Sequence, residues 1–262
     1  MYQLLDLAKY PIDNLDSAEG KKLVADCQAK LASEGIFSLE GFVLPEALIE
    51  CVAEMKPLID EVSYAHKRKH NIYFKDKLEN ITEDHPALQK FETINHTVCA
   101  DQMPSSLVCR LYEWQPFIDF LAAVMGKDVL YRMEDPLARA NVMAYRHGEA
   151  LNWHFDRSEF TTTVILQSPK EGGAFQYRNN LRTDNDPNYD GVANLLNGDD
   201  PDIQTLMIEA GTLNVFKGVY TAHRVTPVEG PTERIVSVYS YYEEPNVMFS
   251  DKERLGFYGR TA

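Results

Sequence analysis

The sequence predicts an α+β fold in which helices come first and an antiparallel β-sandwich or barrel follows. In the first half, apolar residues recur with the spacing of one helix face. The second half contains short runs rich in β-branched and aromatic residues, and Gly, Pro, Asn or Asp separate most of them. Many short strands joined by such turns are typical of an antiparallel sandwich or barrel.

Capping and turn residues set the expected helix boundaries. Ser17 is a suitable cap for a first helix that runs to about Leu31, and Pro45 suits the first turn of a second. A third apolar-periodic run covers 105–125 and stops at Gly126. Between the first two helices, residues 36–39 indicate a short strand. The segment 67–101 has weak periodicity and mixed charge, which favours loops and short helices.

Six strands are expected in the second half: 141–145, 161–166, 173–177, 204–208, 212–216 and 235–242. The segment 179–202 is rich in Asn and Asp and poor in apolar residues, so we expect a long loop inserted between strands. One domain over 1–262 is the simplest organisation. Its expected parts are a mainly helical part (1–130), a β-core (131–248) and a C-terminal tail (249–262).

Composition narrows the class of protein. Hydrophobic residues make up 44% of the 262 residues, which is ample for a large core. The formal net charge of −14 disfavours nucleic acid as a partner, and we interpret the one basic cluster, 66–70, as a solvated helix end or loop. No membrane span or signal peptide is recognisable. Four scattered cysteines without a CxxC pair indicate reduced thiols and a cytoplasmic location.

The chemistry begins with His154 and Asp156. In an extended segment, residues two apart point to the same side, so both side chains can reach one ion. Together with His223 they could form the facial triad of two imidazoles and one carboxylate that holds iron(II) and leaves coordination sites open. Each part alone has an ordinary alternative, either a hydrogen-bonded surface pair or a satisfied core histidine.

Arg234 adds a fourth element. The segment 225–231 contains Pro and Gly and predicts a hairpin, which would bring Arg234 opposite His223, about 5 Å away between Cβ atoms. A guanidinium there could bind the far carboxylate of a dicarboxylate whose keto-acid end chelates the metal. The alternative is a simple ion pair with Glu233 or Glu243.

With these residues in order, the sequence resembles the 2-oxoglutarate/iron(II) dioxygenase superfamily. A closer resemblance, to a bacterial subgroup of radical halogenases of free amino acids and their hydroxylase relatives, rests on motifs spread over most of the chain: 135–137, 141–143, 145–148, 151–156, 159–160, 166–167, 172–177 and 223–228. The resemblance implies a double-stranded β-helix (a jelly-roll, cupin-like core) with the N-terminal helices packed on it. It also implies iron(II) as cofactor, and 2-oxoglutarate and O2 as co-substrates.

One position bears on the reaction. The halogenases of this subgroup have a small residue where Asp156 stands, and the vacancy admits chloride to the iron. A carboxylate here implies hydroxylation of a C–H bond in a small polar molecule, such as a free amino acid or derivative, with no catalytic side chain beyond the metal ligands. Desaturation, cyclisation or halogenation with the same cofactors are alternatives, as are hydroxylation of a protein or nucleic acid and a non-catalytic metal- or ligand-binding β-barrel.

Further candidates surround the triad. Asn141 and Tyr145 lie four apart on one strand face and could bind the keto-acid end of 2-oxoglutarate. The candidates for substrate binding lie near the metal motif in sequence: Arg157, Arg146, Trp153 and Asn152. Core packing also explains Trp153. The expected partner is a small molecule rather than nucleic acid or membrane, and the oligomeric state is left open, with a dimer as one option.

Overall fold

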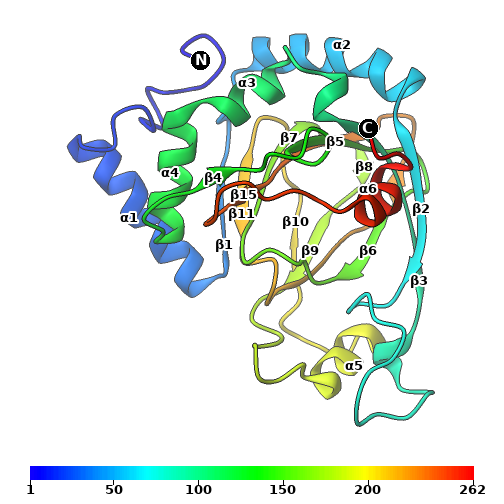
Figure 1. The fold of residues 1–262 in the computed structure, drawn as a ribbon. Coiled ribbons are helices and arrows are strands. Elements are labelled where there is room, and N and C mark those ends of the chain that lie inside the picture. Colours follow the sequence, from blue (N-terminus) through cyan, green and yellow to red (C-terminus); the bar gives the residue numbers. More distant parts are fainter.

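Two facing antiparallel sheets form the centre of the computed structural model, which describes residues 1–262 (Figure 1). The larger sheet has the strand order β1-β11-β7-β14-β5-β3-β2, and the smaller has β10-β9-β12-β6. Two short strand pairs, β13 with β8 and β15 with β4, lie outside them. This arrangement confirms the predicted α+β fold with a double-stranded β-helix core.

The strands of the larger sheet are β1 (Ile36–Leu39), β2 (Tyr64–His70), β3 (Phe91–Cys99), β5 (Ala140–Tyr145), β7 (Thr161–Gln167), β11 (Leu213–Phe216) and β14 (Arg234–Tyr239). Those of the smaller sheet are β6 (Leu151–His154), β9 (Phe175–Arg178), β10 (Gln204–Leu206) and β12 (Ala222–Val225). The short pairs are β4 (Tyr131–Arg132), β8 (Glu171–Gly172), β13 (Val228–Glu229) and β15 (Tyr241–Tyr242). Each of the six predicted strands corresponds to an observed one, and the last divides into β14 and β15.

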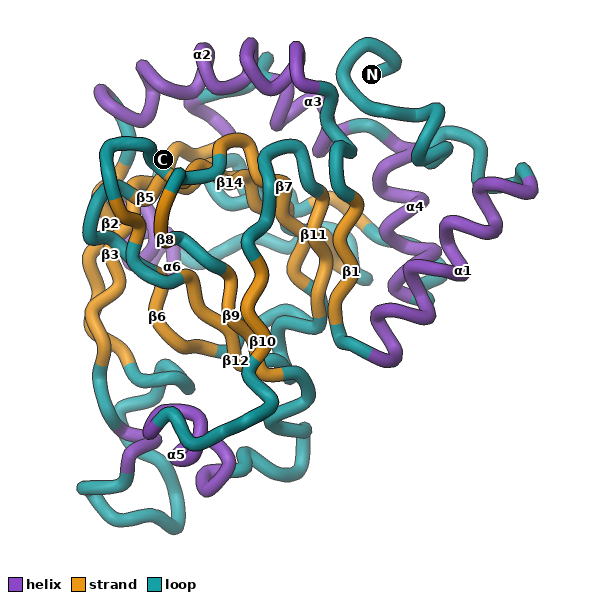
Figure 2. The backbone as a smooth tube through the Cα atoms, turned by 180° about the vertical axis from the view of Figure 1, so that it is seen from behind, coloured by secondary structure: helices purple, strands orange, loops and turns teal.

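Four helices gather beside the larger sheet: α1 (Ala18–Ser33), α2 (Pro45–Glu61), α3 (Leu107–Glu113) and α4 (Gln115–Met125). Figures 1 and 2 show them on one side of the barrel, away from the smaller sheet. Their apolar residues form the main core with one face of the larger sheet, where Ile235 is fully buried. On the same strand Arg234, Val236 and Val238 instead line an internal cavity. Strand alternation thus separates the core face from the cavity face.

The helix boundaries follow the local chemistry. The Ser17 hydroxyl accepts a hydrogen bond from the backbone N–H of Gly20 at 2.9 Å and caps α1, as predicted. The run expected as one helix over 105–125 is instead two, because Trp114 adopts an extended conformation between α3 and α4. Pro116 explains the break, since it cannot donate to the carbonyl four residues earlier and its ring would clash there.

The prediction of loops and short helices for 67–101 is confirmed for 71–90 and 100–101, but it was wrong for 67–70 and 91–99, which belong to β2 and β3. β2 and β3 pair with each other and extend the larger sheet beyond β5. Apolar periodicity is weak there because the inward positions of β3 carry Thr93, Asn95 and Thr97, which line the cavity. A strand that is polar toward a binding cavity and polar toward solvent lacks the alternation that identifies strands in a sequence.

The inserted segment 179–202 is partly ordered as a helix, α5 (Tyr189–Asn197), where a loop was expected. Figure 1 shows α5 at the end of the barrel opposite α2. Val192 and Leu195 pack with Trp153 and Phe155 of the metal motif in a second, smaller apolar cluster. The insertion therefore supports the back of the strand that carries His154.

The expected hairpin between His223 and Arg234 was also wrong. β12 belongs to the smaller sheet, where His223 lies opposite His154 and Tyr177. β14 belongs to the larger sheet, where Arg234 lies opposite Tyr145. The chain between them crosses from one sheet to the other, with Val228 paired to Gly172 of β8 on the way. Arg234 therefore approaches the triad across the cavity and not along a shared ladder.

The C-terminal segment, expected as a tail, contains helix α6 (Asp251–Tyr258) and closes one wall of the cavity with Phe249, Phe257 and Tyr258. Asp135 holds it in place. One of its carboxylate oxygens accepts from Arg254 Nε at 2.8 Å and from the Phe249 N–H at 3.1 Å. The other accepts from the N–H groups of Leu137 and Ala138. The division of the chain into three parts stays a prediction.

No helix is long and apolar enough to cross a membrane. All four cysteines are free and buried, and burial raises the pKa of Cys27 and Cys51 to about 12.

We expect Asp135→Asn to destabilise the protein by about 3 kcal/mol, because it leaves the mostly buried Arg254 side chain without its close charge partner. Burial opposes ionisation, but Arg254 and three backbone N–H groups hold the pKa of Asp135 below its usual value. The contribution is therefore full above the ordinary carboxyl pKa of about 4 and is lost as the pH falls further. Urea unfolding at pH 7 and below pH 4 measures it. The exposed Asp128→Asn serves as control, and equal stability of the two variants at pH 7 would contradict the assignment.

Candidate active site

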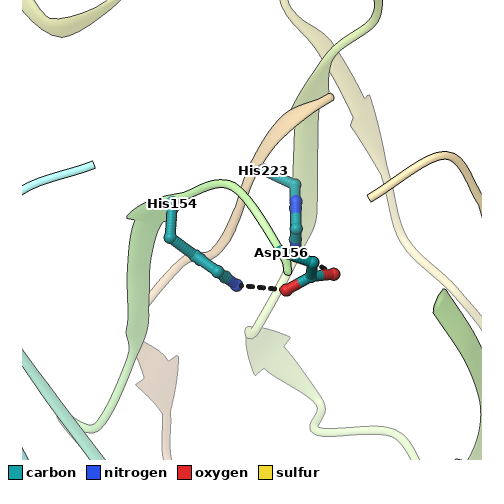
Figure 3. A group of neighbouring side chains, drawn as sticks. All are labelled: His154, Asp156 and His223. Carbon is teal, nitrogen blue, oxygen red and sulfur yellow. Dashed lines mark ion pairs between the residues drawn. The ribbon is translucent and has the colours of Figure 1, made fainter. Parts of the chain in front are cut away.

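Three side chains predicted to bind metal meet in the cavity (Figure 3). His154 Nε2 lies 3.3 Å from one carboxylate oxygen of Asp156, and His223 Nε2 lies 3.4 Å from the other. His154 ends β6 and His223 lies directly opposite it on β12, so the sheet register itself brings the imidazoles together. Asp156 follows β6 by two residues and completes the group.

Both histidine rings are held with Nε2 toward Asp156. The Nδ1 atom of His154 lies 2.8 Å from the carbonyl oxygen of Asn152, and that of His223 lies 3.0 Å from the carbonyl oxygen of Thr221. A carbonyl can only accept, so each Nδ1 carries the proton and donates it. Each Nε2 then presents a lone pair, which is the form in which imidazole binds a metal.

A close turn positions Asp156. Its backbone N–H donates to the carbonyl oxygen of Gly218 at 3.0 Å, and the hydroxyl of Thr161 donates to its carboxylate. A Cβ atom on Gly218 would lie 2.5 Å from both the Asp156 Oδ2 and the Thr161 Oγ1 atoms, so only glycine fits here. Arg182 packs over the Phe155 ring at 4.1 Å and donates to the carbonyl oxygen of Val219. Gly218 and Arg182 carry no recognisable motif and were not predicted.

The protonation states suit cation binding. Burial and the neighbouring His154 lower the pKa of His223 to about 4, so this imidazole is neutral at pH 7. Burial alone would raise the pKa of Asp156, but the two histidines and the Thr161 hydroxyl hold it below its usual range. His223 thus offers a neutral nitrogen donor, and Asp156 offers a carboxylate beside it.

Arg234 lies in the wall of the same cavity and is 6% exposed. Its side chain makes no hydrogen bond or ion pair within the protein, and its guanidinium lies 5.8 Å from the centre of the Tyr145 ring. The expected alternative, a pair with Glu233 or Glu243, is not formed: Glu233 binds Arg146 and Lys56, and Glu243 binds Lys127. Burial lowers the pKa of Arg234. A buried, unpartnered guanidinium favours binding of an anion.

The cavity has a volume of about 330 Å³ and brings the triad, Arg234, Tyr145 and Arg157 together. The other predicted site residues lie outside its lining. The side-chain amide of Asn141 donates to the Leu137 carbonyl, and its oxygen accepts from the Tyr258 hydroxyl. Arg146 binds Glu233 and Asp60. Trp153 packs in the small apolar cluster, and Asn152 donates to the Glu92 carbonyl.

Sequence reasoning missed the cavity wall that β2 and β3 provide. Arg68, His70, Thr93, Asn95 and Thr97 all line the cavity from these two strands. The basic cluster was interpreted as solvated, yet its alternate residues His66, Arg68 and His70 point inward while Lys67 and Lys69 are exposed. Period-2 alternation between Lys and the other basic residues is the signal that could have identified this strand.

Comparison with known proteins agrees with this geometry. Solved structures with a similar fold include a 2OG-Fe(II) oxygenase family oxidoreductase from Burkholderia pseudomallei (14% identity, TM-score 0.52, covering 86% of this chain and 92% of that one). A prolyl-4-hydroxylase from Pseudomonas putida is also similar (14%, TM-score 0.51, 82% and 97%). So is HygX from Streptomyces hygroscopicus, solved with nickel and 2-oxoglutarate bound (12%, TM-score 0.53, 82% and 85%). Comparison with curated protein sequences gives no match.

Fold, triad and family together place the chain in the 2-oxoglutarate/iron(II) oxygenase superfamily. Within that class, the family model for Halogenase D matches residues 19–252. The chain belongs to this family.

We expect Gly218→Ala to weaken iron(II) binding about 10–100-fold, because the added methyl group displaces the Asp156 carboxylate. Competition with a coloured chelator measures the affinity. Gly256→Ala is the matched control, since a Cβ atom there meets nothing within 4 Å. Wild-type affinity in Gly218→Ala would show that Asp156 does not depend on this turn.

Proposed function

We propose that this protein is an iron(II)- and 2-oxoglutarate-dependent oxygenase that hydroxylates a C–H bond of a small polar molecule, a free amino acid or a derivative of one. The supporting observation is a complete His-Asp-His triad in one cavity with a buried, unpartnered arginine. A non-catalytic β-barrel that only binds a ligand has no need of this pairing.

The donor set fits iron(II). Ligands at about 2.1 Å on one face of an octahedral ion lie about 3 Å from each other. The separations of the His154 and His223 nitrogens from the Asp156 oxygens, 3.3 and 3.4 Å, are close to this value. Two neutral nitrogens and one carboxylate are the donors of non-haem iron(II) oxygenases, and three coordination positions stay free for co-substrates.

The cavity also fits 2-oxoglutarate. Its keto-acid end would occupy two positions on the metal, and its far carboxylate would bind Arg234, whose planar fork suits a carboxylate. Thr163 and Asn214, paired on neighbouring strands, add polar groups to the cavity wall farther along the sheet from Arg234. The Tyr145 ring beside Arg234 keeps water from the guanidinium, and a drier environment strengthens the ion pair.

When bound, iron with 2-oxoglutarate and O2 supplies the oxidising power for C–H cleavage. The chain's own residues hold the donors and exclude water. The Asn152 and Thr221 carbonyls keep both imidazoles in the metal-binding tautomer, and Thr161 orients the Asp156 carboxylate. Phe74, Phe155 and Phe216 enclose the triad with apolar surface, which favours reaction with a bound substrate over reaction with solvent.

Asp156 favours hydroxylation over halogenation, although the family model carries the name of a halogenase. Chlorination requires an open position where a halide can bind the iron. Here the Asp156 carboxylate fills that position, and both of its oxygens face the histidine nitrogens. Aerobic turnover with chloride present, followed by mass spectrometry, tests this: hydroxylation adds one oxygen to the substrate, and a chlorinated product would overturn the proposal.

We expect Arg234→Met to raise the half-saturating concentration of 2-oxoglutarate about tenfold or more, because a charge-assisted hydrogen bond contributes about 1.5–3 kcal/mol. Steady-state succinate release against 2-oxoglutarate concentration measures it. Arg132→Met, at an exposed residue of β4 that forms no ion pair, is the control. If both variants behave like the wild type, Arg234 is not the co-substrate anchor.

A further inference from the structure

The charges that line the cavity restrict the primary substrate. Asp156 is the only acidic residue among the lining, and it is committed to the triad. Two cations line the cavity besides Arg234, namely Arg68 and Arg157. The ring of His70 also lines the cavity, but both of its nitrogens have partners in the protein, the Asn71 carbonyl at 3.0 Å and the Thr93 hydroxyl at 2.8 Å. A buried ammonium group needs an acidic partner, and this wall offers none.

Arg68 is the cation without a partner. Its side chain forms no hydrogen bond or ion pair within the protein, and its guanidinium lies 4.8 Å from the centre of the Phe74 ring. The same ring lies 5.9 Å from the ring of His154, so one phenyl group separates Arg68 from the metal site. Asp76 contributes an attractive charge, but it is 94% exposed and pairs with Lys90.

Phe74 is held in this place by a strained turn. Its φ of 55° lies in the left-handed region, which a bulky side chain rarely adopts. The buried Asn71 fixes the turn, because its side chain accepts from the N–H groups of Tyr73 and Lys75 and donates to the Lys75 carbonyl. Strain that the surroundings maintain so firmly is typical of a binding site. The turn therefore fixes Phe74 in place between Arg68 and the triad, and so fixes the separation between the two.

Arg157, the other cation of the lining, is not available to bind an anion. Its guanidinium donates to Glu253 at 2.8 Å, so its charge is already balanced at the mouth of the cavity. Within the loaded centre, iron(II) and Arg234 carry three positive charges, and Asp156 and 2-oxoglutarate carry three negative ones. Arg68 therefore remains the single uncompensated charge facing the substrate.

Aromatic side chains form much of the rest of the wall, among them Phe160, Tyr242, Phe249 and Phe257. Neutral polar side chains also line it, and one of them offers a free donor. Asn95 is 3% exposed; its oxygen accepts from Thr97, while its NH2 group has no partner in the protein and belongs to the cavity lining. A buried amide donor of this kind suits a carbonyl or carboxylate oxygen of a ligand.

We propose that the primary substrate is a carboxylic acid with an apolar body and no free amino group, such as an N-acylated or deaminated amino acid, and that Arg68 binds its carboxylate. This inference rests on the proposed function and narrows its substrate class from amino acids in general to those whose ammonium group is masked or absent.

Matched compounds test the substrate class. The probes are L-phenylalanine, N-acetyl-L-phenylalanine and 3-phenylpropionate, with the corresponding leucine, N-acetylleucine and 4-methylpentanoate. Two readouts apply: stimulation of succinate release, and the shift in melting temperature of the anaerobic protein loaded with iron(II) and 2-oxoglutarate. We expect at least one masked or deaminated acid to act at a concentration about tenfold or more below that of its free amino acid. Equal or better response to the free amino acids, or no response to any of the six, overturns the inference.

The role of Arg68 in binding the substrate carboxylate is tested by Arg68→Met, with Lys67→Met as matched control. Lys67 is the neighbour of Arg68 on β2, but its side chain is 63% exposed and pairs with Glu92 outside the cavity. We expect Arg68→Met alone to raise the KM for the acid about tenfold or more and to leave the half-saturating 2-oxoglutarate concentration unchanged. Equal behaviour of the two variants overturns the role of Arg68. Wild-type protein that fails to bind 2-oxoglutarate counts against the proposed function instead.

Discussion

The pairing of β12 with β6 is the contact on which the site depends. It places His223 directly opposite His154, and no loop has to hold either imidazole. A shift of one residue in this register would turn one ring to the other face of the sheet and dissolve the triad. The α5 insertion packs on the outer side of the same strands, with Val192 and Leu195 against Trp153. The inserted helix α5 thus helps to stabilise the pairing of β12 with β6.

The two faces of the larger sheet have different roles: one packs in the core and the other lines the cavity. One face, with α1–α4, forms the main apolar core and supplies stability. The other face is freed for polar and charged groups, and it carries Arg234 on β14 and Asn95 and Thr97 on β3. These buried polar groups lower stability unless something binds them. Their concentration on one face therefore indicates ligand contacts for the co-substrate and the substrate.

Much of the fold and the metal site could be predicted from the sequence, because both depend on local patterns. Strand periodicity located β5, β7 and β11, and the spacing of His154 and Asp156 indicated one ion. The predicted hairpin between His223 and Arg234 was wrong, because strand pairing between distant segments decides where Arg234 lies. Arg234 reaches the cavity by a crossover between sheets, although the Pro- and Gly-containing turn favoured a hairpin.

The sequence analysis missed the part of the cavity wall formed by β2 and β3 for a related reason. β2 and β3 face a cavity with polar side chains, so hydrophobic periodicity does not mark them. Asn141 shares a strand with Tyr145, yet it is bound to Leu137 and Tyr258, and only the packing of α6 reveals this. Residues near the triad in sequence, such as Arg146 and Asn152, lie outside the cavity, while Arg68, far from it in sequence, lines it.

Anaerobic titration of the purified protein with iron(II) and 2-oxoglutarate tests the central claim most directly. Chelation of iron by the keto acid in a triad site should produce a weak visible charge-transfer band that saturates at one equivalent of each. The same titration of His223→Ala should give no band, because the register that joins β12 to β6 then delivers only one imidazole. Absence of the band in the wild type, or an unchanged band in His223→Ala, would contradict this account of the site.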